Sequence, residues 1–204
     1  MKQVIDDFYW PLHALPAIAT AGRFPLDDHA FKTRYVGGTH ALHVHDYEGV
    51  LRLGQATIPL RPGDVTLSAS GVVSAYDLPR AGFHWCVHFL PAAGTAAASA
   101  ATSAAGSAAD PTAGGSSVSD SSAGILSTGK GVTAAPLPLH LPLGSLGEHA
   151  GQRIMAIAQL HTGGGDAVAS AAASAALLEL LLWLSMQARI LRRTGSASRG
   201  SGAV

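Results

Sequence analysis

Short runs of alternating apolar and polar residues fill the segment between residues 39 and 89. The alternation has a period of two, which places successive side chains on opposite faces of a β-strand. Because the runs are short and closely spaced, they predict a small β-barrel or sandwich with a polar interior. They cover residues 41–45, 50–53, 58–60, 65–67, 72–76 and 84–89.

Glycine and proline separate these predicted strands where tight turns require them. Gly54 and Gln55 predict a hairpin turn, since glycine adopts a positive φ without strain. Pro62 and Gly63 stand at the central positions of a predicted type II turn, and residues 79–82 predict another turn.

The composition changes at residue 92. Ala, Ser, Gly and Thr dominate residues 92–135, and no aromatic residue occurs there. We expect a disordered insertion, because such a segment buries too little apolar surface to offset the ordering of its backbone. Leucine and proline then alternate in residues 136–144, which favours an edge strand. Residues 1–91 and 136–145 are therefore expected to form one barrel.

Residues 146–193 have the apolar period of two helices. Three glycines from Gly163 onward end the first helix, and Asp166 is a candidate N-cap of the second. Apolar residues in the second helix recur at alternating spacings of four and three, which is typical of a coiled-coil seam. We expect this helical hairpin to form a homodimer and to be followed by a disordered tail, residues 194–204. The expected dimerisation residues are Leu177, Leu181, Leu184, Ala188 and Leu191.

Composition excludes several function classes. The chain has 204 residues, with 13 basic and 13 acidic side chains, so it lacks the excess positive charge of a general nucleic-acid binder. Cys86 is its single cysteine and the N-terminus lacks a signal-peptide pattern, so we expect a cytoplasmic protein. A membrane span over residues 167–186 has a suitable length but would bury Glu179, so we expect no membrane segment.

Several motifs resemble one known family. They are ALHVHDYEGVLRLG, the turn IPLRPGDVTLS, YDLP followed by HWCVHF, and the helical LLELLLWLS. Together they resemble the N-terminal domain of AraC-type transcription regulators. The resemblance implies a mainly β fold with an α appendage, in which a cupin-like jelly-roll β-barrel precedes a two-helix antiparallel hairpin. It also implies a small-molecule effector inside the barrel, for which a sugar-like molecule is one option, and a dimer formed by the helices.

DNA binding in this family belongs to a separate domain with two helix-turn-helix units. The residues after Leu191 are too few for such a pair, so we expect DNA binding only if these units are supplied elsewhere. The chain would then be a truncated or frameshifted regulator, or a stand-alone sensor. The expected effector-binding residues, which suit a sugar, a polyol or an acid equally, are His43, His45, Tyr47, Glu48, Tyr76 and His88.

The histidines also raise the possibility of a metal site. Gly37, His43 and His45 fit the pattern of metal-dependent cupins, but Glu48 comes one residue early and Ser74 replaces the last histidine ligand. His84 or His88 could substitute from a neighbouring strand. Should both strands turn these residues inward, five nitrogen and sulfur ligands, His43, His45, His84, Cys86 and His88, would surround one cavity.

Trp85, Val87 and Phe89 are competing candidates for the buried face of that strand. We therefore expect hydrogen-bonded histidines without a bound metal and without a cofactor; a structural or sensing metal and a catalytic metal are the alternatives.

We expect a non-enzymatic sensing and dimerisation domain, since no nucleophile–base–acid arrangement and no phosphate-binding loop are found. One alternative is a small metal-dependent cupin enzyme, such as an isomerase or a dioxygenase. Another is a non-catalytic dimerisation partner of a full-length regulator.

Overall fold

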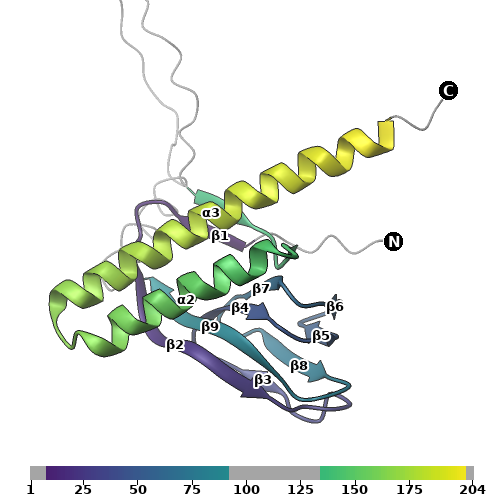
Figure 1. Cartoon of the computed structure of the whole chain (residues 1–204), viewed down its shortest axis with the longest axis horizontal. Helices are drawn as coiled ribbons and strands as arrows, with labels where there is room; N and C mark the ends of the chain where they lie inside the picture. Colours follow the sequence, from purple (N-terminus) through teal and green to yellow (C-terminus); the bar gives the residue numbers. More distant parts are fainter. Residues whose placement is uncertain (1–7, 92–133, 201–204) are drawn as a thin grey trace, which may run out of the picture.

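A computed structural model describes residues 8–91 and 134–200 (Figure 1). The first range contains β1 (Phe8–Pro11), β2 (Pro16–Leu26), β3 (Tyr35–Val36), β4 (His40–His45), β5 (Gly49–Leu53), β6 (Ala56–Leu60), β7 (Asp64–Ser68), β8 (Val73–Asp77) and β9 (Gly82–Pro91). The second contains β10 (Ala134–Leu137), β11 (His140–Pro142), α2 (Leu146–Gly163) and α3 (Ala167–Gly200).

Two antiparallel sheets form a jelly-roll barrel. One sheet has five strands in the order β11-β7-β4-β9-β2, and the other has four in the order β3-β8-β5-β6. In the first sheet β4 pairs with β9, and in the second β5 pairs with β8. The consecutive strands β4 and β5 therefore cross from the first sheet to the second beside β8 and β9, which cross back. This side-by-side crossing of two strand pairs is the winding of a jelly roll. Both expected glycine turns are present, because Gly54 and Gly63 adopt φ values of 57° and 88°.

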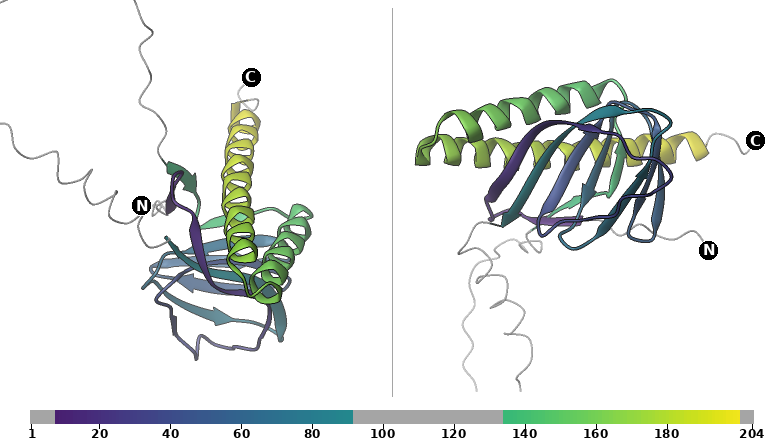
Figure 2. Two further views of the ribbon diagram at one scale, coloured as in Figure 1. Left: turned by 90° about the vertical axis from the view of Figure 1, so that its left-hand side faces the viewer. Right: turned by 90° about the horizontal axis from the view of Figure 1, so that it is seen from below.

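Helices α2 and α3 run antiparallel and cover the outer face of the five-stranded sheet (Figure 2). The alternation of the strands explains the packing, since most of the residues of β4 and β9 on the face toward the helices are apolar. Leu42, Val87 and Phe89 of the sheet share one core with Ile154 and Leu181 of the helices. A second core lies on the inner side of the four-stranded sheet and includes Leu26, Tyr47, Leu51, Ile58 and Tyr76.

The expected fold is confirmed: a cupin-like jelly-roll barrel is followed by a two-helix antiparallel hairpin. The expected edge strand in residues 136–144 is divided between β10, which pairs with β1, and β11, which pairs with β7 at the end of the five-stranded sheet. The predicted disordered insertion covers residues 92–135, of which residues 92–133 lie outside the described residues and the last two, Ala134 and Ala135, begin β10.

The expected dimerisation seam is wrong for four of its five residues. Leu177, Leu181, Leu184 and Ala188 are buried within the core of this chain, and Leu191 alone among them is exposed. The spacing of four and three did identify a packed seam. That seam, however, packs against α2 and the five-stranded sheet of the same chain, so these four side chains are not accessible to a second subunit.

Helix α3 is also longer than expected. It continues to Gly200, so the predicted disordered tail begins too early at residue 194. The physical reason is that Ala, Ser and Arg all tolerate helical backbone, and Thr194 donates its hydroxyl to the carbonyls of Ile190 and Leu191. Part of α3, Ala167–Thr194, is long and apolar enough to cross a membrane by length and composition. Leu177, Leu180, Leu181 and Leu184 of this part pack in the protein core.

Candidate metal and ligand site

Strands β4 and β9 turn a set of nitrogen and sulfur side chains toward the barrel interior. His43 is paired with Cys86, His45 with His84, and Ala41 with His88. Paired residues of antiparallel strands project to the same side of the sheet, so all five donors share one face. The competing apolar residues of β9 occupy the other face. Both faces of β9 are thus buried. The five nitrogen and sulfur donors share one inward face, which is the arrangement that the sequence analysis considered for a metal site.

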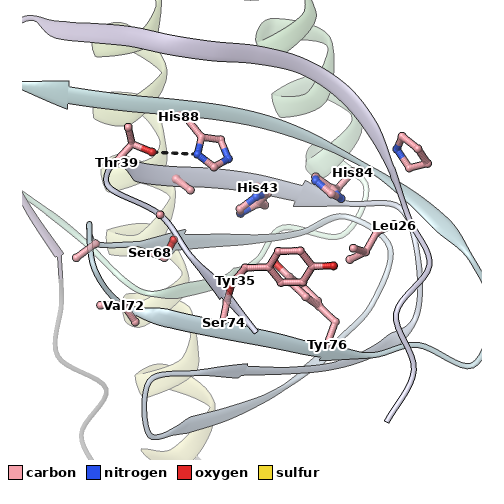
Figure 3. A pocket seen from close by; sticks show the side chains of 14 residues that line it. Leu26, Tyr35, Thr39, His43, Ser68, Val72, Ser74, Tyr76, His84 and His88 are labelled. Atoms are coloured by element: carbon pink, nitrogen blue, oxygen red, sulfur yellow. Dashed lines mark hydrogen bonds between the residues drawn. The ribbon is translucent and has the colours of Figure 1, made fainter. Parts of the chain in front are cut away.

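This inner face borders a cavity of about 260 Å³ between the two sheets (Figure 3). His43, His84 and His88 form one wall from the five-stranded sheet, while Tyr76 approaches from the four-stranded sheet. Tyr35 lies against Tyr76 with a centroid distance of 6.0 Å. The complete lining is Pro25, Leu26, Tyr35, Gly37, Thr39, Ala41, His43, Ser68, Ala69, Val72, Ser74, Tyr76, His84 and His88.

Three of the donors come together closely enough to share a metal ion. One ligand atom each from His43, Cys86 and His88 lies within 4.8 Å of the other two. Ligand atoms around one tetrahedral zinc are about 3.3–3.8 Å apart, given the usual metal–ligand bond lengths. Small side-chain rotations therefore suffice to close the set, and two imidazoles with a thiolate are a donor set that suits zinc or a related transition metal.

The two remaining histidines of the inner face differ from one another. His45 is fully buried, and its ring nitrogens lie 2.9 Å from the Tyr47 hydroxyl and 2.8 Å from Thr66 Oγ1. Its hydrogen-bonding capacity is satisfied, which is the usual condition of a structural histidine. His84 Nδ1, in contrast, is buried and has no hydrogen-bond partner among the described residues. The ring of His84 is 5.0 Å from that of His43, so it is a fourth candidate ligand.

Burial keeps these imidazoles neutral. Desolvation, followed by the neighbouring His84, His45 and His88, lowers the pKa of His43 well below its usual value. Desolvation and then His88 lower the pKa of His84 to about 4. Neutral rings at pH 7 have a lone pair free for a cation. Burial also raises the pKa of the Cys86 thiol to about 12, so a metal bound there must displace the thiol proton.

The structure brings together only part of the expected effector site. His43, Tyr76 and His88 line the cavity. Tyr47 lies behind it, bonded to His45 in the second core. Glu48 is exposed and borders a separate surface hollow beside Arg61 and Asp77. The residues compared above with the metal-dependent cupin pattern, His43, His45 and Glu48, therefore do not converge as ligands, because Glu48 is exposed and both ring nitrogens of His45 are engaged.

Other lining residues were missed from the sequence. Thr39 places its Oγ1 3.0 Å from His88 Nδ1 and thereby orients that ring (Figure 3). Tyr35 and Ser68 come from strands whose pairing the sequence left undefined. What identifies Tyr35 and Ser68 as lining residues is the pairing register of their strands. In this register Ser68 of β7 is paired with Ala41, and Tyr35 of β3 is paired with Ser74. Once the register is known, the period of two assigns each of them to the inner face.

Of the comparisons made with known proteins, the one with solved structures found similar chains. No family model matches the chain, and no curated protein matches it. A Thermotoga maritima protein described as a predicted oxalate decarboxylase is 18% identical, with 36% of this chain and 68% of that one covered and a TM-score of 0.32. A Ralstonia eutropha JMP134 protein provisionally described as a mannose-6-phosphate isomerase is 15% identical, with 42% and 86% covered and a TM-score of 0.30. A Streptococcus pyogenes protein of unknown function is 16% identical, with 45% and 80% covered and a TM-score of 0.33.

These neighbours require one correction. The sequence led us to expect a protein without enzymatic activity, and this expectation is contradicted, because two of the structures with a related barrel are described as enzymes. At such low identity the likeness concerns the fold, and fold alone does not assign a reaction. The barrel therefore gives no reason to exclude catalysis, and the choice of function depends on the site.

Proposed function

We propose that this chain is a metal-dependent cupin enzyme that binds a transition-metal ion through His43, Cys86 and His88. The observation that carries the proposal is the convergence of these three donors within 4.8 Å beside a cavity of about 260 Å³. Catalytic zinc sites typically have three protein ligands and keep one position open for substrate or water. This proposal replaces the expectation of unmetallated histidines.

The surrounding residues fit such a site. When His88 ligates through Nε2, its Nδ1–H donates to Thr39 Oγ1, which fixes the ring and its tautomer. The unpartnered Nδ1 of His84 is a buried polar atom that a metal or a metal-bound substrate would satisfy. A bound metal ion would supply Lewis acidity, polarising a substrate oxygen or activating a water molecule. The barrel contributes a small cavity of about 260 Å³.

The cavity lining restricts the substrate class. Within the described part of the chain, its lining contains no Lys, Arg, Asp or Glu. The metal would be the positive charge of the site, so an anionic group away from it would be desolvated without a partner. Hydroxyl groups of Tyr35, Ser68 and Ser74 offer hydrogen bonds instead. We therefore propose a small substrate that presents one hydroxyl, carbonyl or carboxylate group to the metal and is otherwise uncharged.

Metal analysis of protein purified without a metal-affinity tag tests the binding step. We expect about one equivalent of metal per chain in the wild type and less than about a tenth in His43→Ala. His13→Ala is the matched control, because His13 is exposed and distant in sequence from β4 and β9. Wild-type protein from metal-replete cells with less than about a tenth of an equivalent would exclude this function.

Azide binding to the cobalt-substituted protein tests the catalytic part. A catalytic site has an open coordination position, whereas a structural site is closed by four protein ligands. We expect azide to shift the cobalt visible bands, with an effect that saturates. Unchanged bands would mean that His84 closes the site and that the metal is structural.

A second candidate is effector sensing in a dimer, as the sequence resemblance implies. The observation that favours it is an exposed apolar strip on the C-terminal part of α3, formed by Met186, Ile190 and Leu191. Sedimentation of the full chain tests this proposal. We expect Ile190→Glu to dissociate a dimer, whereas Val168→Glu, an exposed apolar position at the other end of α3, leaves it intact. A wild-type monomer at micromolar concentration contradicts it.

A further inference from the structure

The outer face of the four-stranded sheet carries two arginines on either side of a small residue. Arg52 of β5 is paired with Ala75 of β8. On the other side of β8, β3 pairs Tyr35 with Ser74 and Val36 with Val73, so the same register places Arg34 beside Ala75. Tyr35 and Tyr76 line the inner cavity. The alternation of strands therefore directs Arg34 and Arg52 outward.

A hollow lies between these arginines. It has a volume of about 380 Å³ and is lined by Phe31, Arg34, Arg52, Gly54, Val73 and Ala75. Both helices cover the opposite sheet, so they leave this face open (Figure 1). Neighbouring strands are about 4.8 Å apart, which separates the two arginine backbones by roughly 10 Å. Two long side chains starting at this distance can reach one small group between them.

The two arginines of this hollow have no ion-pair partner within the described part of the chain, since the ion pairs found there do not include Arg34 or Arg52. Asp77 is the carboxylate that shares this face of β8, and its Oδ1 accepts a hydrogen bond from the backbone N–H of Ala30 at 2.8 Å. Both guanidinium groups thus keep their donors available for an anion.

Arg52 is also held in position. Its guanidinium carbon lies 3.7 Å from the centroid of the Phe31 ring, a stacked cation–π contact. Phe31 and the preceding Ala30 have φ values of 55° and 56°, a conformation that costs a residue other than glycine about 1–2 kcal/mol. Hydrogen bonds from Ala30 to Asp77 and from the Phe31 N–H to the Tyr76 carbonyl hold this turn. Stacking reduces the entropy that Arg52 loses when it binds a ligand.

We propose that Arg34 and Arg52 form a binding site for the phosphate group of a small molecule. A planar guanidinium donates two parallel hydrogen bonds to an oxyanion. A carboxylate has two oxygens and is satisfied by one such fork, whereas a phosphate has enough oxygens for two forks approaching from opposite sides. This site lies outside the barrel and is independent of the proposed metal site.

Calorimetric titration of the full chain with pyrophosphate and with inorganic phosphate tests the proposal. We expect one saturable site with a dissociation constant below about 1 mM for pyrophosphate at low salt. Arg34→Gln and Arg52→Gln should each weaken binding by about tenfold or more, since each removes one charged fork. Arg80→Gln is the matched control, because Arg80 is exposed in the loop before β9. Acetate should bind much more weakly than phosphate.

Three outcomes would overturn the proposal. The first is a lack of saturable pyrophosphate binding up to about 10 mM, which corresponds to an affinity too weak for a built site. The second is an equal loss of affinity in Arg80→Gln, which would indicate non-specific charge attraction. The third is binding to vesicles containing phosphatidic acid without binding to soluble pyrophosphate, which would assign the arginines to a lipid surface. The His43→Ala variant should keep its pyrophosphate affinity, so failure here is separable from failure of the metal site.

Discussion

The two faces of the β4–β9 pair have opposite chemical character, since one face is apolar and the other carries histidines. Leu42 and Val44 of β4 face the helices and are almost fully buried among apolar side chains. His43 and His45, which alternate with them, face the barrel interior among other histidines. One face therefore contributes apolar burial and stability, and the other carries polar groups that apolar packing cannot stabilise.

In a sheet that is covered on both sides, this difference shows which face is the candidate for a functional site. Burying imidazoles costs free energy unless they find partners. His45 has found two partners within the protein, whereas His84 Nδ1 has none among the described residues and Cys86 holds a thiol of raised pKa. The inner face is thus divided into a satisfied structural part and an unsatisfied part, and the unsatisfied part borders the cavity.

The largest expected effect is on the apolar face. Leu42→Ala removes a side chain that is 1% exposed, and we expect a loss of about 2–5 kcal/mol in the free energy of unfolding. Urea denaturation at pH 7 measures it. Metal stoichiometry of the folded fraction should not change. A loss below about 1 kcal/mol would show that the helix–sheet core is loosely packed.

The satisfied part of the inner face should respond next. His45→Leu leaves the hydroxyls of Tyr47 and Thr66 without their partner, and each buried unsatisfied group costs about 1–3 kcal/mol. Tyr47→Phe removes only the hydrogen bond between His45 and Tyr47, whereas His45→Leu removes that bond and the one to Thr66. Comparing the free energies of unfolding of the two variants therefore separates the two contributions. Metal content should stay at the wild-type level in both variants. Loss of metal in His45→Leu would make His45 a ligand and contradict its structural role.

Acid should destabilise the metal-free protein through the inner face. Burial lowers the pKa of His45 to about 3 and that of His84 to about 4, below the usual value of 6.5. Between about pH 6.5 and pH 4 the unfolded chain therefore binds protons at these histidines, whereas the folded chain keeps them neutral. The free energy of unfolding thus falls as the pH drops through this range, by about 1.4 kcal/mol per pH unit for each such histidine. Denaturation midpoints measured between pH 7 and pH 4 check this. In His45→Leu the slope should be shallower.

The smallest expected effect on stability belongs to His43→Ala in the metal-free protein. Its ring lies beside the cavity and makes no hydrogen bond found among the described residues, so we expect a change below about 1 kcal/mol. In the presence of excess zinc the gap to the wild type should widen, because a ligand present at 100 times its dissociation constant stabilises by about 2.7 kcal/mol. Thermal unfolding with and without zinc measures both values. An identical zinc response in His43→Ala would remove His43 from the ligand set.

The sequence predicted the strands from β4 to β9, the turns between them and the helical hairpin, because each of these rests on a local period or on glycine and proline. It did not predict β1, β2 and β3. It did place His43 and His45 on one face, and His84, Cys86 and His88 on another. Whether these two faces meet depends on the pairing of β4 with β9, strands about 40 residues apart, and no local pattern encodes that pairing. The same limit explains the dimerisation residues, since a seam from Leu177 to Ala188 looks alike whether it packs on its own chain or on a second one.

The proposed metal site of the inner face is tested most directly by the absorption spectrum of the cobalt(II) form. We expect titration of the metal-free chain to end at about one equivalent, with visible bands of tetrahedral cobalt and a near-ultraviolet band from sulfur-to-cobalt charge transfer. Cys86→Ser should lose the charge-transfer band, and His43→Ala should lose tight binding. A wild-type protein that binds no cobalt, or one whose spectrum is unchanged by Cys86→Ser, would contradict the assignment of His43, Cys86 and His88 as a metal site.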